Sequence, residues 1–205
     1  MSQVLRRLHD DHINVRRVLS ILERQINAMD RGGRPDWDIV QGIIEYLMTY
    51  PDLRHHPLEN RVFAQMQRKD ARTAQDFAGL EVEHREQSEA LRRIAAATLD
   101  VLGDASMARQ GYAGLLRSFA AAQRDHIRRE EETFFPAAKR VLDEVGWAEL
   151  EREMPAMLDP LFDDRIERRF GMLRQELTFL DAADQIERRA EGFEHSGIIP
   201  GGRIP

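Results

Sequence analysis

Four histidines and two glutamates in this chain have the types and spacing of metal ligands. They are His12, His55, Glu59, His84, His126 and Glu130. In two places a glutamate follows a histidine by four residues, so on a helix the imidazole and the carboxylate leave the same face and can bind one cation together. A single histidine precedes each His-x-x-x-Glu motif at a nearly equal interval. This repetition predicts one helical hairpin used twice around a shared metal centre.

The donor types narrow the choice of metal. The chain has no cysteine, which excludes disulfides, iron–sulfur clusters and thiolate zinc sites, so a metal must take nitrogen and oxygen ligands. Two carboxylates buried without a counter-charge would cost much free energy, and two cations bridged by the glutamates would remove that cost. Imidazole with carboxylate suits iron, manganese or zinc, and this mixture in a helical core favours a non-haem diiron centre.

Each motif alone has a more ordinary explanation. A lone histidine among apolar residues is usually a hydrogen-bonded core residue, and His-x-x-x-Glu is often a surface ion pair. Four such histidines, two of them with a glutamate at the same offset, favour the metal site instead.

The surrounding sequence predicts the helices that position these residues. Apolar residues recur in steps of three and four from about residue 2 to 30, and His12 fills a missing position of that stripe. A second helical stretch covers about 37–68. It is interrupted by Pro51 and Pro57, because proline lacks the amide hydrogen that a helix uses.

The second half of the chain repeats this arrangement. A third helix is predicted over about 74–102, where His84 takes a core position one turn after Leu80. A fourth runs over about 106–145, and Pro136 is expected to bend it.

Four helices of this length with short connections predict an all-α protein, an antiparallel up-down-up-down four-helix bundle that carries the metal site in residues 1–145. Residues 146–205 are expected to form a C-terminal helical extension. It would contain a short helix from Trp147 to Met154, an amphipathic helix over about 160–190 and an irregular tail rich in glycine and proline.

Charge and hydropathy limit the partners. The net charge of −6 among 205 residues argues against nucleic acid, because phosphate binding needs an excess of lysine and arginine. The N-terminus lacks an apolar leader and no long apolar run occurs, so we expect a cytoplasmic protein that does not enter a membrane.

These motifs resemble the hemerythrin-like, HHE cation-binding family of four-helix bundles. The matching stretches are Leu8 to His12, Tyr50 to Glu59, Leu80 to His84 and His126 to Pro136. The resemblance implies a diiron site, oxo- or hydroxo-bridged, with the six residues above as ligands, and it implies that Pro57 is tolerated within a ligand helix. Manganese and zinc remain alternative metals.

The chain departs from the oxygen-carrying hemerythrins at two points. Those carriers have a second histidine one turn after the third-helix ligand, where this chain has Ser88, and their fourth-helix acid comes one residue later than Glu130. The pattern is similar to the four-histidine branch of the family, whose members are linked to iron sensing, nitric-oxide or peroxide chemistry and repair of damaged iron centres.

Four neighbours of the predicted ligands are candidates for orienting an imidazole or relaying protons. They are His56, Glu81, Glu83 and Glu131. His9 falls beside the apolar stripe and is expected at the surface.

The predicted function is that of a diiron protein that binds or reacts with a small diatomic or peroxide ligand, such as dioxygen, nitric oxide or hydrogen peroxide, as a sensor, scavenger or stress-response protein. A diiron enzyme, either a peroxidase or one acting on nitric oxide or damaged iron centres, is the alternative, so whether the chain is an enzyme stays open. A ferritin-like oxidase fits less well because Glu-x-x-His occurs only at Glu81 to His84. A fourth hypothesis is a metal-stabilised interaction module, in which residues 146–205 contact a protein partner or a second copy.

Overall fold

A computed structural model of the chain describes residues 2–103, 108–154, 159, 161 and 170–182. All regular secondary structure among these residues is helical, which confirms the predicted all-α class. The expected irregular tail lies outside the described residues. None of the described helices combines the length and the apolar character needed to cross a bilayer.

Helix α1 (Gln3–Asp30) is a single uninterrupted helix, as predicted. The Ser2 hydroxyl accepts a hydrogen bond from the Leu5 amide and so satisfies one of the free N–H groups of the first turn. The chain leaves the helix through Gly32, whose φ of 75° lies in the left-handed region that favours glycine.

The second helical stretch is continuous but changes its winding in the middle. It consists of α2 (Trp37–Tyr50), the π turn η1 (Pro51–His55) and α3 (His56–Lys69). In η1 the amide of His56 donates to the carbonyl of Pro51, five residues back. The wider turn accommodates Pro57, which lacks an N–H and whose ring would crowd a carbonyl in a regular α-helix.

The third helix starts later than the sequence predicted. Residues expected to open it instead form α4 (Ala71–Ala74) and the 3₁₀ turn η2 (Gln75–Phe77), and α5 (Leu80–Gly103) follows. The cause is local: the Asp70 side chain accepts from the Thr73 amide and caps a separate short helix.

The fourth stretch repeats the construction of the second. Helix α6 (Ala108–Arg129) leads into a second π turn, η3 (Glu130–Phe134), and then into α7 (Phe135–Val141), with Pro136 in its first turn. Helix α8 (Glu144–Glu153) follows, at the position of the predicted short helix.

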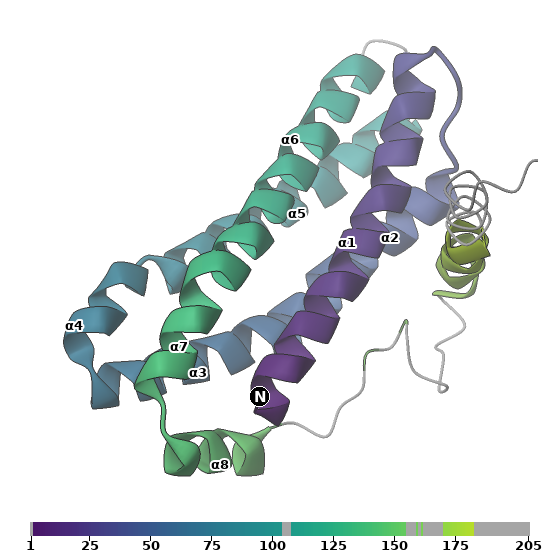
Figure 1. Cartoon of the computed structure of the whole chain (residues 1–205). Helices are drawn as coiled ribbons and strands as arrows, with labels where there is room; N and C mark the ends of the chain where they lie inside the picture. Colours follow the sequence, from purple (N-terminus) through teal and green to yellow (C-terminus); the bar gives the residue numbers. More distant parts are fainter. Residues whose placement is uncertain (1, 104–107, 155–158, 160, 162–169, 183–205) are drawn as a thin grey trace, which may run out of the picture.

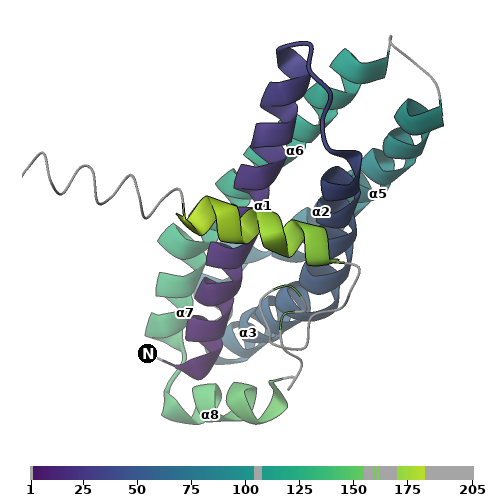
Figure 2. The ribbon, with the colours of Figure 1, turned by 90° about the vertical axis from the view of Figure 1, so that its right-hand side faces the viewer.

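The long helices pack side by side as a bundle (Figures 1 and 2). Helix α1 contacts α6 and α2, while α5 contacts the same two helices. Helix α8 contacts α1 and α3 at one end of the bundle.

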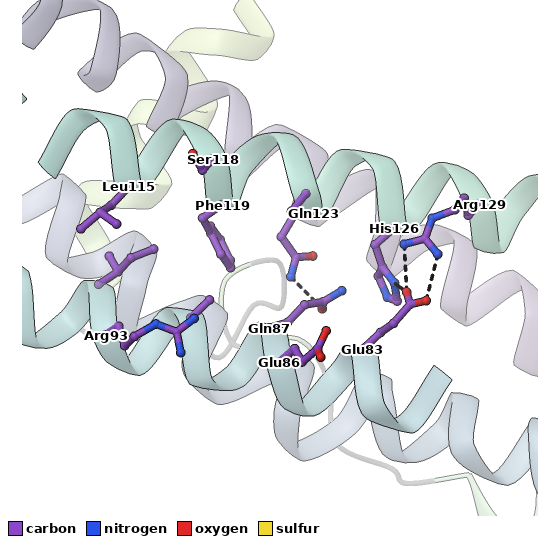
Figure 3. Close-up of a pocket in the computed structure, with 13 residues that line it drawn as sticks. Glu83, Glu86, Gln87, Arg93, Leu115, Ser118, Phe119, Gln123, His126 and Arg129 are labelled. Carbon is purple, nitrogen blue, oxygen red and sulfur yellow. Dashed lines mark hydrogen bonds and ion pairs between the residues drawn. The ribbon is translucent and has the colours of Figure 1, made fainter. Parts of the chain in front are cut away.

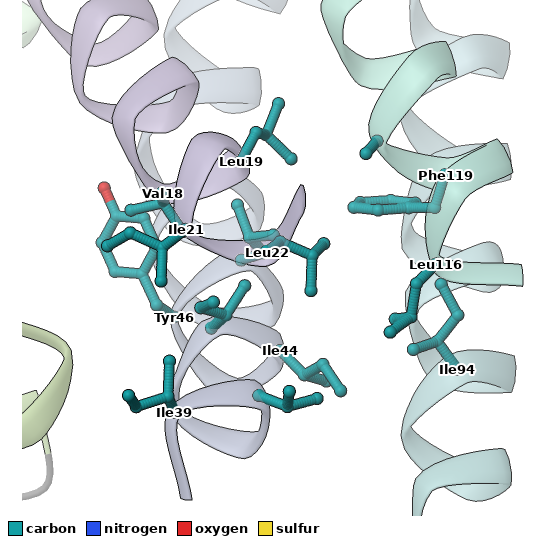
Figure 4. Close-up of a cluster of buried hydrophobic side chains, with 14 of the residues drawn as sticks. Val18, Leu19, Ile21, Leu22, Ile39, Ile44, Tyr46, Ile94, Leu116 and Phe119 are labelled. Atoms are coloured by element: carbon teal, nitrogen blue, oxygen red, sulfur yellow. The ribbon is translucent and has the colours of Figure 1, made fainter. Parts of the chain in front are cut away.

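Two apolar clusters fill the interior. The larger one, part of which is shown in Figure 4, joins buried side chains of α1, α2, α5 and α6. The smaller one joins the start of α1 to α3, α7 and α8. Along α1, Leu8 belongs to the smaller cluster, Val15 to the larger, and His12 lies between them. The apolar core therefore encloses a polar layer.

A helix of residues 171–182 crosses α1 and α2 on the outside of the bundle (Figure 2). Phe170 and Leu173 are buried there, and the ring of Phe170 meets that of Tyr46 edge to face. An ion pair joins Arg24 of α1 to Glu176 at 3.1 Å. The position agrees with the predicted amphipathic helix, of which the structure describes this part.

The larger cluster should dominate the stability of the bundle. Leu19 is 0% exposed, so Leu19→Ala should leave a cavity and lower the free energy of unfolding by about 2–5 kcal/mol. Leu99→Ala is the matched control because Leu99 is 67% exposed, and it should change stability by less than about 0.5 kcal/mol. Chemical denaturation of both variants measures the difference, and equal losses would contradict this description of the core.

Candidate metal centre

The structure brings the six predicted ligand residues together in the polar layer of the bundle. Each is at most 5% exposed, although all six are polar. They come from every wall of the bundle: His12 from α1, His55 from η1, Glu59 from α3, His84 from α5, His126 from α6 and Glu130 from η3.

The six residues form two overlapping groups of four. One consists of His12, His55, Glu59 and Glu130; the other consists of His84, His126, Glu59 and Glu130. Within each group, one potential ligand atom per residue lies within 4.8 Å of the others. Both glutamates are members of both groups, so the arrangement has the form of two adjacent cation sites with two shared carboxylates.

Glu59 is completely buried and lies beside three imidazoles. Its oxygens lie 3.7 Å from Nε2 of His12 and 3.4 Å from Nε2 of His55. On the other side, Nε2 of His84 is 3.4 Å away. The carboxylate therefore faces both histidine pairs.

Glu130 occupies the equivalent position opposite. Its oxygens lie 3.3 Å from Nε2 of His12, 3.6 Å from Nε2 of His84 and 3.0 Å from Nε2 of His126. Burial and the neighbouring Glu130 charge raise the pKa of Glu59 well above its ordinary value. Burial would also raise the pKa of Glu130, but the adjacent imidazoles of His12, His126 and His84 outweigh burial and hold that pKa well below its ordinary value.

Several of these atoms are buried without a hydrogen-bond partner. Among the described residues, both oxygens of Glu59, both oxygens of Glu130 and Nε2 of His84 and His126 make no hydrogen bond. Buried polar atoms are nearly always satisfied in native proteins, because leaving them unpaired is costly. Cations between these atoms would satisfy them, so the donor set fits metal ions.

Each imidazole also has an oxygen partner on its outer nitrogen, Nδ1. The pairs are His12 with Glu131 at 3.1 Å, His55 with Asp11 at 3.3 Å, His84 with Asn60 at 3.2 Å and His126 with Glu83 at 3.1 Å. An acceptor at Nδ1 places the ring proton there and leaves the Nε2 lone pair directed inward, toward a cation. The Nε2 atoms of His12 and His55 lie only 3.0 Å apart, and two lone pairs at that distance repel unless a positive charge lies between them.

The four oxygen partners form a closed circuit around the bundle. Asp11, Asn60, Glu83 and Glu131 are each the sequence neighbour of a candidate ligand, but each holds the imidazole of a different helical segment. Asp11 of α1 contacts His55 of η1, and Asn60 of α3 contacts His84 of α5. Glu83 of α5 contacts His126 of α6, and Glu131 of η3 contacts His12 of α1.

Further ion pairs fix the acidic members of this circuit. Arg129 binds Glu83 with two hydrogen bonds of 2.9 Å, as Figure 3 shows, and these bonds are the main cause that lowers the pKa of Glu83. Burial alone would raise the pKa of Glu131, but hydrogen bonds from His12 and Arg16 outweigh it and lower the pKa to about 2.

The four neighbours named from the sequence have different surroundings. Glu83 and Glu131 hold imidazoles, whereas Glu81 is exposed and makes no hydrogen bond or ion pair within the described part of the chain. His56 is buried, stacks on His84 with ring centroids 4.1 Å apart, and has Nδ1 3.2 Å from an oxygen of Asp52. Burial lowers the pKa of His56 to about 3, against the opposing effect of Asp52.

His9 and Ser88 lie outside the two groups of candidate ligands. His9 is half exposed at the surface, with Nδ1 3.2 Å from an oxygen of Glu131. Ser88 donates a hydrogen bond of 2.6 Å to Asp52 rather than adding a nitrogen to the centre.

Sequence reasoning missed Asp11 and Asn60. Asp11 is 3% exposed and also accepts from the Tyr50 hydroxyl at 3.1 Å. Its signal was available, because position 11 lies three residues after Leu8 and four before Val15, on the same apolar stripe as His12. Asn60 gave no comparable signal, since it lies directly beside Glu59 and outside any stripe.

Each π turn contains a candidate metal ligand. The first ends at His55 and the second begins at Glu130. A π turn accommodates one extra residue in a helix and so rotates the following side chains relative to a regular α-helix, which is why π turns recur at functional sites. Prolines two residues after η1 and η3 identify these positions in the sequence as irregular, but not the kind of irregularity.

Fold and site together define a helical-bundle protein with a buried histidine and carboxylate centre for cations. The profile of the hemerythrin HHE cation-binding domain matches residues 3–138. The chain therefore belongs to the hemerythrin HHE cation-binding family, which confirms the resemblance seen in its sequence motifs. No curated protein and no solved structure gives a significant match to the chain.

The circuit of oxygen partners should contribute to metal affinity. Asp11→Ala removes the acceptor at Nδ1 of His55 and should weaken metal binding by about 10–100-fold, because the imidazole loses its fixed tautomer and orientation. Asp10→Ala is the matched control, since Asp10 is the exposed neighbour on the same helix. Competition titrations against a chromophoric chelator measure both affinities. Equal affinities in the two variants would show that Asp11 does not position the imidazole.

Proposed function

We propose that this chain is a non-haem diiron protein that binds or reacts with a small diatomic or peroxide ligand. The six residues of the two overlapping groups are proposed to hold the metals, with Glu59 and Glu130 shared between them. One observation carries the proposal: two fully buried carboxylates, each facing both histidine pairs, have no hydrogen-bond partner among the described residues. Iron is favoured over zinc and manganese by the mixed imidazole and carboxylate donors and by the family, in which iron is the typical cation.

Free coordination positions and a small adjacent chamber support the proposal that a small ligand binds at the metals. Each group offers two imidazoles and two shared carboxylates, which is fewer donors than six-coordinate iron accepts. A small chamber of about 20 Å³ touches His12, His55 and His126. That volume suits one molecule of about the size of water. Iron bound by the two groups would supply reversible ligand binding and electrons, while the protein supplies a size-limited space beside it and fixed imidazoles.

The four-histidine branch of the family is the proposed affiliation. Ser88 takes the place of the additional third-helix histidine of oxygen carriers, so one metal has one nitrogen donor fewer and one position more for an exogenous ligand. This difference favours sensing or scavenging of dioxygen, nitric oxide or hydrogen peroxide over simple oxygen carriage.

A diiron enzyme is the second candidate, and one observation favours it. The chamber is also lined by His56 and Asp52, which are paired with each other through Nδ1 at 3.2 Å. Hydrogen-bonding groups at this position could orient a peroxide or nitric-oxide substrate, as a peroxidase or a nitric-oxide reductase would require.

The architecture that carries this function is proposed to be an antiparallel up-down-up-down four-helix bundle over residues 1–145. The packing of α1 and α5 against both α2 and α6 supports it. Residues 146–205 are proposed to form a C-terminal helical extension, supported by α8 and by the helix of residues 171–182.

Metal analysis tests the centre directly. Purified protein should contain two irons per chain by elemental analysis, with a Mössbauer spectrum of a coupled pair. Glu59→Gln should lose binding at both positions because Glu59 belongs to both groups, whereas the exposed control Glu81→Gln should retain it. Removal of metal should lower the free energy of unfolding, by about 4 kcal/mol for each site when free metal is at 1,000 times the dissociation constant of that site. Zinc alone in the purified protein would contradict the proposed redox function.

Ligand binding tests the rest of the proposal. Reduced protein mixed with dioxygen, nitric oxide or hydrogen peroxide in a stopped-flow instrument should develop a new near-ultraviolet or visible charge-transfer band with at least one of them. One equivalent consumed per centre would favour a sensor or binding protein, and many equivalents would favour an enzyme. No spectral change with any of the three would overturn the proposal.

A further inference from the structure

A surface cleft of about 500 Å³ lies between α5 and α6, close to the candidate metal centre. Its walls are partly apolar, with Leu115 and Phe119 on α6, and charged side chains such as Glu83 and Arg129 lie at the end nearest the centre (Figure 3). His126, one of the candidate ligands, is among the lining residues. The cleft therefore extends from the surface to the edge of the polar layer.

The small chamber beside the centre lies behind this cleft. Three residues line both spaces: Gln87, Gln123 and His126. The wall between the cleft and the chamber is therefore formed by the two glutamines and an imidazole.

The two glutamines are joined across the wall. The amide nitrogen of Gln123, on α6, donates a hydrogen bond of 2.8 Å to the amide oxygen of Gln87, on α5, and Figure 3 shows this bond between the two helices. Gln123 is buried, whereas Gln87 is half-buried. A single bond between neutral amides contributes little net stability, and the half-buried Gln87 side chain can leave it by a change of rotamer. The wall can therefore open without movement of either helix.

We propose that the hydrogen-bonded pair Gln87 and Gln123 is a gate through which a small uncharged molecule passes from the cleft into the chamber. The proposal rests on the proposed function, since it assumes that the ligand binds at the chamber. The amide pair carries no charge and the chamber admits about one water-sized molecule, so the route favours nitric oxide, dioxygen or hydrogen peroxide over anions and larger reductants.

A second way into the chamber provides the alternative outcome. Ser88 and Asp52 also line the chamber and are joined by a hydrogen bond of 2.6 Å between α5 and η1. If ligands enter past this pair, changes in the cleft will leave the entry rate unaltered.

Variants that obstruct the cleft or remove one glutamine test whether the glutamine pair is the gate. Ala122 is exposed and lines the cleft, so Ala122→Trp should obstruct it without disturbing the core. Ala121→Trp is the matched control, because Ala121 is the exposed neighbour outside the cleft lining. Nitric oxide should associate with reduced, metal-loaded Ala122→Trp at least tenfold more slowly than with the control, and at least threefold faster with Gln123→Ala than with the unaltered protein. Equal rates in the two tryptophan variants would overturn the gate.

A thiol in the chamber gives a measurement that does not depend on ligand binding by iron. The chain has no cysteine, so Val15→Cys, a change of similar side-chain size at a residue outside both entry routes, places its sole thiol at the chamber wall. Oxidation of this thiol to a sulfenic acid by hydrogen peroxide, which releases water, is followed by mass spectrometry in the zinc-loaded protein, because zinc does not consume the peroxide. The rate should fall with Ala122→Trp, stay unchanged with Ala121→Trp and rise with Gln123→Ala. If nitric oxide never binds but the thiol rates follow this order, the proposed function fails and the gate stands. If the thiol rates are insensitive to all three changes, the gate is wrong.

Discussion

The structure depends on two carboxylates placed face to face inside an apolar bundle. Glu59 and Glu130 are buried and both belong to both ligand groups, and the pKa of Glu59 is raised whereas that of Glu130 is lowered. Like charges at such a distance cannot both be ionised in a low-dielectric interior without compensation. The two proposed cations would supply that compensation, and the four inward-facing Nε2 atoms would then be donors to them instead of mutually repelling lone pairs. The bundle is organised so that this polar layer is enclosed between the larger and the smaller apolar cluster.

Much of this arrangement could be predicted from the sequence, because helical periodicity places side chains on faces with little ambiguity. His12 and His84 replace apolar residues in stripes whose other members are buried, so their inward direction followed from spacing alone. The i, i+4 pairing of His55 with Glu59 and of His126 with Glu130 had the same basis. The all-α class followed from composition and periodicity together.

The remaining features could not be predicted because they depend on contacts between helices. Asn60 and Glu83 acquire their roles only when α3, α5 and α6 pack together, and no local pattern distinguishes Glu83 from the exposed Glu81. The start of α5 was predicted too early because the Asp70 cap turned the preceding residues into a separate short helix. Pro57 and Pro136 indicated irregular winding, but the π turns next to them require the hydrogen-bond pattern of the folded chain.

The circuit of oxygen partners has a mechanical consequence for the bundle. Each of the four helical stretches, α1, α2–η1–α3, α5 and α6–η3–α7, carries at least one ligand and the acceptor for an imidazole on the next stretch, and the last stretch contacts the first. A segment that slides or rotates by one residue therefore withdraws its own ligand and at the same time releases the adjacent imidazole from its fixed orientation. A register error in one helical stretch therefore also disturbs the ligands on the next one. Correct alignment of the four helical stretches therefore also positions the ligands of both candidate groups.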